Sequence, residues 1–293
     1  MVPVQKRITG GRLMTQSKKS CMFMVMALAV VCAGWASPDR VPAETVLKIG
    51  GTGSALGTMK QLVQEFEKKQ PGIKIQILPS LGSTAGIKAA LGGRLALALS
   101  SRPLTESERL AGGMEVEYAR SPFVFVTNGK VSKQDVTSRE LQDFYHAPLP
   151  TWPDGSRLRL IMRPAKDIDS KLVRGISPGL EQAVQAALAR PGMVIAITDQ
   201  ESTEAVAKTP GALGGATLAE IVSDQWPVNV LSFNGVKPSA ETIADGSYPL
   251  VKSLYLVTTP HTPAAAREFA DFVRSPAGGE ILARTGNLVP EPK

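Results

Sequence analysis

The chain has 293 residues, two cysteines, and 33 Lys and Arg against 26 Asp and Glu, which gives a formal charge of +7. This length suits one large domain or two lobes. Five of the basic side chains and both cysteines, Cys21 and Cys32, lie in the first 36 residues. Without that segment the charge falls to +2 and no cysteine remains. This excludes disulfides, thiolate nucleophiles, cysteine metal sites and nucleic-acid binding by bulk electrostatics.

The first 36 residues have the pattern of a secretory signal peptide. Basic side chains precede an apolar run at 22–33, which is shorter than the about 20 residues that span a bilayer. Small residues allow cleavage after Ala36, so we expect a periplasmic or secreted protein in which a linker, residues 37–46, precedes the folded part. Two alternatives stay open: lipoprotein processing at Cys32 and a start at Met14.

Strand and helix patterns alternate along the rest of the chain. The apolar periodicity predicts, in order, strand 46–49, helix 56–66, strand 73–77, helix 85–91, strand 95–99, strand 122–127, helix 138–144, strand 158–162, helix 179–189, strand 193–198, helix 202–207, strand 248–258, helix 264–273 and helix 278–284. Residues 211–215 interrupt the pattern before 216–222. This alternation indicates an α/β protein whose ligands bind at the carboxyl ends of its strands.

Three segments rich in glycine and hydroxyl side chains follow apolar strands. They are GTGSALG at 51–57, GSTAG at 82–86 and SSRPL at 100–104. Glycine lets the backbone approach a ligand closely, and the N–H groups that open a helix carry partial positive charge. Because the three segments lie within about fifty residues of one another, we interpret them as one shared anion-binding site.

Common catalytic and cofactor motifs are missing from the sequence. The glycine spacing of 51–57 fits neither a dinucleotide fingerprint nor a P-loop, and no Gly-x-Ser-x-Gly elbow is present. His146 and His261 have no spaced partner for metal binding or base catalysis. We therefore expect a protein that is not an enzyme and has no cofactor and no metal.

The order of these segments resembles the substrate-binding proteins of ABC importers, in particular the phosphate-binding family. The resemblance is carried by KIGGTGSALG, by GSTAGIKAAL, by the apolar strand that runs into SSRPL, and by YPLVKSLYLVTTP with FADFVRSPAGGEIL near the end. It covers residues 47–290. It implies a small oxyanion ligand such as phosphate, an ABC permease or membrane sensor as partner, and a monomer.

The resemblance also implies a type II periplasmic-binding-protein-like α/β fold. This fold has two lobes, each a mixed sheet flanked by helices, joined by two hinge crossings. Lobe one would comprise residues 47–125 and 254–291, and lobe two residues 126–253. The crossings would be 123–126 and 251–254.

By position, the family's ligand contacts fall on the three segments and on a strand end in lobe two. The implied ligand-binding residues are Gly53, Ser54, Ala55, Ser83, Thr84, Ser101, Arg163, Asp169 and Ser170. Hydroxyl and N–H groups donate to an anion, and a guanidinium can hold two oxygens at once. Arg102 either reaches the cleft or forms a salt bridge at its rim.

The sequence departs from the family pattern in two places. Ser101 stands where phosphate binders usually have an aspartate that accepts the proton of hydrogen phosphate, which weakens discrimination against fully ionised anions. The family's Ser-Gly-Thr after the arginine is replaced by a stretch that contains Asp167 and Asp169. Each carboxylate near a dianion would cost about 1–4 kcal/mol.

Several explanations of the two aspartates stay open. They point away from the ligand, pair with Lys166 or Arg163, cap the helix that begins near Ser170, or select an oxyanion that bears an amine. The leading hypothesis is an exported binding protein that closes two lobes on a small oxyanion. The alternative is an exported scaffold or sensor that keeps this fold with anion binding lost or changed.

Overall fold

The computed structural model describes residues 45–291, which belong to one compact unit. The predicted signal peptide and linker residues 37–44 lie outside the described residues. None of the helices within 45–291 is long and apolar enough to cross a membrane.

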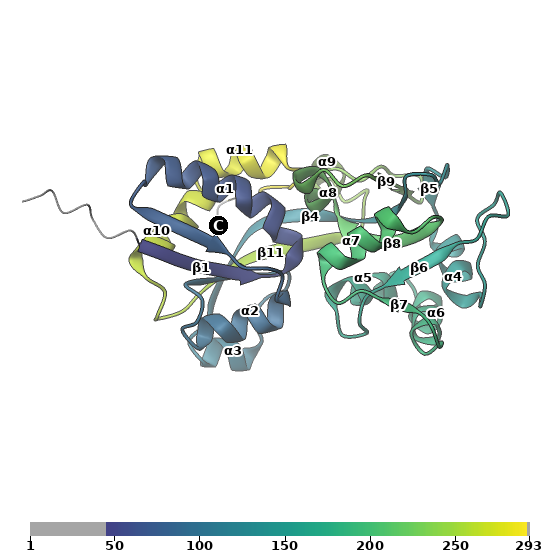
Figure 1. Cartoon of the computed structure of the whole chain (residues 1–293), viewed down its shortest axis with the longest axis horizontal. Helices are drawn as coiled ribbons and strands as arrows, with labels where there is room; N and C mark the ends of the chain where they lie inside the picture. Colours follow the sequence, from purple (N-terminus) through teal and green to yellow (C-terminus); the bar gives the residue numbers. More distant parts are fainter. Residues whose placement is uncertain (1–44, 292–293) are drawn as a thin grey trace, which may run out of the picture. The chain divides into compact units, whose positions relative to one another are not determined.

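A mixed sheet of nine strands runs through the described residues (Figure 1). Its strands are β1 (Thr45–Gly51), β2 (Ile73–Ile77), β3 (Leu97–Ser100), β4 (Met114–Asn128), β6 (Arg159–Met162), β7 (Val194–Ile195), β8 (Ala212–Thr217), β9 (Val228–Val230) and β11 (Val251–Thr258). The order is β2-β1-β3-β11-β4-β8-β6-β7, with β9 also on β4. The short strands β5 (Asp135–Val136) and β10 (Ser232–Phe233) pair separately.

Strand β4 joins the two halves of this sheet. It pairs with β11 as far as Pro122 and with β8 from Phe123 onward. We call the half around β1, β2 and β3 the first lobe and the half around β6, β7 and β8 the second lobe. The mixed sheets, the flanking helices and the strands shared between the halves agree with the expected fold class. The boundaries at 125/126 and 253/254 stay a prediction.

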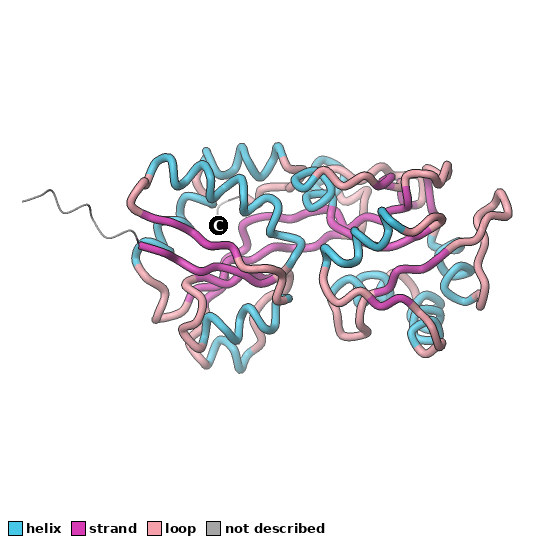
Figure 2. The backbone as a smooth tube through the Cα atoms, viewed as in Figure 1, coloured by secondary structure: helices cyan, strands magenta, loops and turns pink. Residues whose placement is uncertain are grey.

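Helices cover both faces of the first-lobe strands (Figure 2). They are η1 (Gly53–Ala55), α1 (Leu56–Lys69), α2 (Gly82–Leu91), α3 (Glu106–Leu110), α10 (Ala264–Val273) and α11 (Pro276–Arg284). The apolar residues of α1 recur at three- and four-residue steps and are buried as predicted, against α10 and α11. Phe66 of α1, for example, makes an edge-to-face contact with Phe269 of α10.

The second lobe has its own core. Its helices are α4 (Ser138–His146), α5 (Ile168–Gly175), α6 (Pro178–Leu188), α7 (Asp199–Lys208), α8 (Leu218–Asp224) and α9 (Ala240–Ala244). Phe123, Phe125, Phe233 and Tyr248 form a chain of ring contacts in this core. The buried Tyr248 hydroxyl donates to the carbonyl of Phe123 at 2.8 Å, so a residue near β11 anchors the start of the β4 segment in the second lobe.

The predictions for two glycine-rich segments need correction. The helix predicted at 85–91 begins earlier, at Gly82, so Ser83 and Thr84 lie in its first turn. The segment 211–215 does not interrupt the alternation, because most of it belongs to β8. Glycine is needed there for packing: a Cβ at Gly215 would lie 2.4 Å from the Phe123 ring. The glycines at 211–215 predict an interruption of the pattern, but most of them lie in a strand that packs closely against the side chain of Phe123.

Candidate functional site

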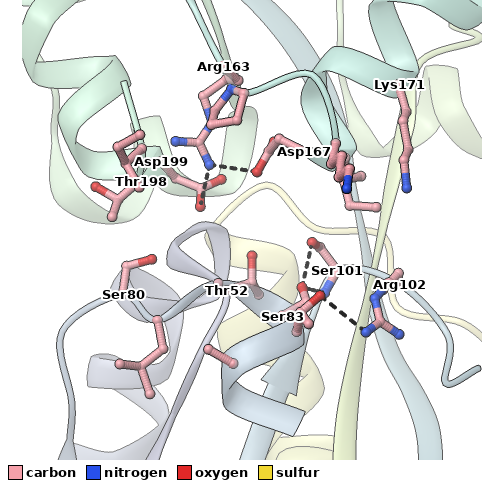
Figure 3. Close-up of a pocket in the computed structure, with 18 of the residues that line it drawn as sticks. Thr52, Ser80, Ser83, Ser101, Arg102, Arg163, Asp167, Lys171, Thr198 and Asp199 are labelled. Carbon is pink, nitrogen blue, oxygen red and sulfur yellow. Dashed lines mark hydrogen bonds and ion pairs between the residues drawn. The ribbon is translucent and has the colours of Figure 1, made fainter. Parts of the chain in front are cut away.

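A pocket of about 500 Å³ lies between first-lobe and second-lobe segments. Figure 3 shows its two walls facing each other. Thr52, Ser80, Ser83, Ser101 and Arg102 come from the first-lobe side, and Arg163, Asp167, Lys171, Thr198 and Asp199 come from the second-lobe side. Most of these residues follow the carboxyl end of a strand, which is where α/β sheets place ligand sites.

The first-lobe wall is built on the N-terminus of α2. The N–H groups in the first turn of a helix have no intrahelical acceptor, and in α2 no side chain caps them. The Ser83 hydroxyl accepts from the Ser101 backbone N–H at 2.9 Å and lies 3.0 Å from the Ser101 hydroxyl. The segments 82–86 and 100–104 therefore meet at this wall, as the sequence predicted.

Two further hydroxyls on this wall lack partners. Thr52 is only 2% exposed, lines the pocket, and its hydroxyl has no hydrogen bond among the described residues (Figure 3). The Ser80 hydroxyl is buried and is likewise unpartnered there. Buried polar groups are normally hydrogen-bonded. These two donors are therefore available to a ligand together with the α2 amides.

Arg102 sits at the rim with both oxygens of Glu108 as partners. Its two terminal nitrogens donate to this carboxylate at 2.8 Å, and one also donates to Thr84 at 3.3 Å. The hydrogen bonds from Arg102 outweigh the effect of burial and lower the pKa of Glu108 to about 2. Arg102 thus forms the rim salt bridge and also lines the pocket.

On the opposite wall, Arg163 follows β6 and is 6% exposed. Its guanidinium donates to the carbonyl of Ala196 at 3.0 Å and to Asp167 Oδ2 at 3.0 Å, and Asp199 Oδ2 lies 3.7 Å away. Burial lowers the pKa of Arg163, but the negative charges of Asp199, Asp167 and Asp169 raise it by more, so the pKa lies above its ordinary value. The arginine is therefore fixed as a cation.

Asp199 opens α7 and occupies the donors of the first glycine loop. Its Oδ1 accepts from the Ser54 hydroxyl at 2.6 Å, and its Oδ2 accepts from the Gly53 N–H at 3.1 Å. Gly53 has room for this contact only because it lacks a side chain, since a Cβ would lie 2.7 Å from Asp199 Oδ2. The cradle predicted for an external anion thus holds a carboxylate of the chain itself.

Lys252 of β11 links this carboxylate to a second one. Its Nζ donates to Asp199 Oδ1 at 2.9 Å and to Asp169 Oδ1 at 2.5 Å, and all three side chains are buried. Burial raises the pKa of Asp199, but Lys252 and Arg163 more than reverse this, so its pKa lies below the ordinary value. For Asp169 burial dominates and raises the pKa to about 6, with Asp199 and Asp167 adding to it.

Asp167 is the N-cap of α5. Its Oδ1 accepts from the Asp169 N–H at 2.9 Å, while Oδ2 pairs with Arg163. Two of the sequence interpretations therefore hold for this residue: it caps the helix and it pairs with Arg163. The helix begins at Ile168, two residues before the position expected.

The structure separates the nine predicted ligand residues into two groups. Four of them line the pocket: Ser83, Thr84, Ser101 and Arg163. The other five lie behind its surface: Gly53, Ser54, Ala55, Asp169 and Ser170. Gly53 and Ser54 hold Asp199, Ala55 is fully buried, Asp169 holds Lys252, and the Ser170 hydroxyl donates to the Arg163 carbonyl.

Sequence reasoning missed Thr52, Asp199 and Lys252. The sequence contains a pattern that could have located Asp199. Thr198 and Glu201 form a capping box directly after an apolar segment, which predicts that a helix begins at Asp199. Lys252 is a single cation inside the otherwise apolar run 248–258, which marks it as a paired buried charge. Thr52 had no signal beyond its place in the glycine loop.

The fold and this pocket define an α/β binding protein with a polar ligand site between two lobes. Comparison with known families gives a match to the PBP superfamily domain over residues 39–277. Because the match covers most of the chain, the protein belongs to the PBP superfamily. This confirms the resemblance noted in the sequence.

Curated relatives and solved structures agree with this membership. The chain is 23% identical to the phosphate-binding protein PstS of Borreliella burgdorferi, covering 84% of this chain and 90% of that protein. It is 25% identical to PstS of Bacillus subtilis, covering 86% and 85%.

Two solved structures share the fold. One is a phosphate-bound putative phosphate ABC transporter substrate-binding protein of Clostridium perfringens, with a TM-score of 0.71, 21% identity and coverage of 84% and 100%. The other is the Azotobacter vinelandii periplasmic molybdate-binding protein, with a TM-score of 0.59, 18% identity and the same coverage. At these identities the structures establish the fold, and the predicted fold class is confirmed.

Proposed function

We propose that this protein is an exported solute-binding protein that captures a small oxyanion, phosphate in the simplest case, for an ABC importer. The observation that carries the proposal is the uncapped N-terminus of α2, which opens into the pocket beside the unpartnered hydroxyl of Thr52. The names of the relatives from Borreliella burgdorferi and Bacillus subtilis support the same ligand class.

We propose that the protein acts by binding, as the names of its relatives suggest. Among the described residues, the pocket contains no histidine or cysteine, and its two carboxylates are both engaged with cations and backbone N–H groups. Closure of the two lobes on the ligand would tell a membrane permease that the protein is loaded. We propose a periplasmic or secreted location, with the signal peptide removed near Ala36.

The test is calorimetric titration of the purified exported protein with inorganic phosphate, compared with two matched threonine variants. Thr52→Val removes a hydroxyl aimed into the pocket, and a hydrogen bond to a charged group contributes about 1.5–3 kcal/mol. The phosphate affinity should therefore fall about ten- to hundredfold. Thr127→Val is the control, because the Thr127 hydroxyl is unpartnered, as that of Thr52 is, but it is buried away from the pocket.

A second candidate function has one observation in its favour. Asp199 occupies the Gly53 and Ser54 donors, as it would in a scaffold or sensor that has replaced an external anion with an internal one. In that case neither phosphate, sulfate nor molybdate would produce heat of binding or raise the melting temperature. Phosphate binding that Thr52→Val weakens and Thr127→Val leaves intact would exclude this candidate.

A further inference from the structure

Among the described residues, four helix starts border the pocket; that of α7 is capped by Thr198 in a capping box with Glu201, and two others are occupied by the chain's own aspartates. Asp199 takes the donors of the loop before α1, and Asp167 caps α5. The N-terminus of α2 has no such cap. An anionic ligand therefore has one helix start available, on the first-lobe wall, with the hydroxyls of Thr52 and Ser80 beside it.

The pocket is large for an inorganic oxyanion. Its volume is about 500 Å³, which falls in the range of roughly 300–1,000 Å³ typical of sites for organic small molecules. A tetrahedral oxyanion has five non-hydrogen atoms, and water, with one, occupies about 30 Å³. On that scale such an anion fills less than half of the pocket as it stands, so there is room for further groups of the ligand before the lobes close.

The remaining volume is bordered by cations without carboxylate partners. Lys88, Lys166 and Lys171 line the pocket and are exposed, and among residues 45–291 no carboxylate lies within salt-bridge distance of them. Lys171 comes from the second-lobe wall and lies opposite Arg102 (Figure 3). This end of the pocket can therefore neutralise a second negative charge.

The pocket carboxylates do not favour a positively charged group on the ligand. Both oxygens of Asp167 are engaged, one with the Asp169 N–H and one with Arg163. Both oxygens of Asp199 are engaged as well, with Ser54, Gly53 and Lys252. Neither aspartate has an oxygen without a partner for an ammonium group, so a ligand that bears an amine gains nothing here.

We propose that the ligand is an organic phosphate that carries a second anionic group. Its phosphate binds at the N-terminus of α2 with Thr52 and Ser80, and its second anionic group lies beside Lys171, which has no carboxylate partner among the described residues. This rests on the proposed function, because it names the ligand class of the same pocket.

The experiment titrates the purified exported protein with three probes. Glycerol 3-phosphate and 3-phosphoglycerate have three carbons each and differ in one carboxylate, and inorganic phosphate lacks the organic part. We expect 3-phosphoglycerate to bind at least about tenfold more tightly than the other two, as one added charge-assisted contact would give. Lys171→Gln should remove most of that advantage and change the affinity for inorganic phosphate less than about twofold.

Two further variants control for general effects. Lys237→Gln alters an exposed lysine that lines none of the described pockets and should leave all three affinities unchanged. Thr52→Val should weaken all three probes by a similar factor, because they share the phosphate position.

The titrations distinguish a failure of the organic-phosphate proposal from a failure of the proposed function. If inorganic phosphate binds as tightly as 3-phosphoglycerate, or if Lys171→Gln weakens all probes equally, the organic-phosphate proposal is wrong while the proposed function stands. If none of the probes binds, the proposed function fails and this inference fails with it.

Discussion

Replacing Asp199 by asparagine tests whether the buried charge cluster holds the two lobes together. The carboxylate is 4% exposed and accepts hydrogen bonds from Ser54, Gly53 and Lys252 at 2.6, 3.1 and 2.9 Å. The asparagine side chain would keep the shape but leave Lys252 with one carboxylate partner, Asp169. Removing one member of a buried ion pair typically costs about 3–5 kcal/mol.

The expected loss is large enough to measure in two ways. The free energy of unfolding from urea titration at pH 7 should fall by about 3–5 kcal/mol. Since 1 kcal/mol shifts the melting temperature by about 2–4 °C in a domain of this size, the melting temperature should fall by about 6–20 °C. Asp143→Asn is the control, because Asp143 pairs with Arg139 at 3.5 Å on the exposed surface, where such a pair contributes at most about 1 kcal/mol.

A loss below about 1 kcal/mol for Asp199→Asn, equal to that of the control, would contradict this prediction. It would mean that the contacts of Asp199 with the first loop contribute no net stability. In that event the loop donors would be available to an external anion at little cost.

Three further predictions concern pH, selectivity and packing. Burial raises the pKa of Glu220 to about 8, so the folded state holds a proton that the unfolded state releases near pH 4.5, and stability should fall as pH rises from about 4.5 to 8. Glu220→Gln should flatten that decline in melting temperature, and an unchanged slope would contradict the assignment. Because Ser101 supplies no carboxylate to accept a ligand proton, sulfate should compete with phosphate within about tenfold in displacement titrations; strict phosphate selectivity would argue against this. Gly51→Ala would place a Cβ 1.9 Å from a backbone carbonyl oxygen at a φ of +150°. The free energy of unfolding in urea should therefore fall by at least about 2 kcal/mol. Gly72→Ala is the control, because no atom lies within 4 Å of the added Cβ, and it should lower the free energy of unfolding by less than about 1 kcal/mol.

Local sequence patterns accounted for most of the secondary structure. The three- and four-residue spacing of apolar side chains in α1 and the alternation in β2 need only short-range information, because each pattern reflects which face of its own element is buried. The predicted secondary structure was wrong where the same local pattern occurs in two kinds of structure. The glycines at 214 and 215 are typical of a loop, yet they make room for Val206 and Phe123 in the packed sheet.

Adjacent residues alone are enough to show that glycine and hydroxyl loops follow the strands and that Arg163 stands at the end of a strand. What those donors bind depends on the packing of distant segments, which the sequence pattern does not reveal. Asp199 reaches Gly53 across 146 positions of the chain, and Lys252 reaches Asp169 across 83. Such contacts depend on how separate strands and lobes are packed. Because an unpaired buried charge is costly, each buried charge is paired with a residue that the fold brings close, however distant it is in the sequence.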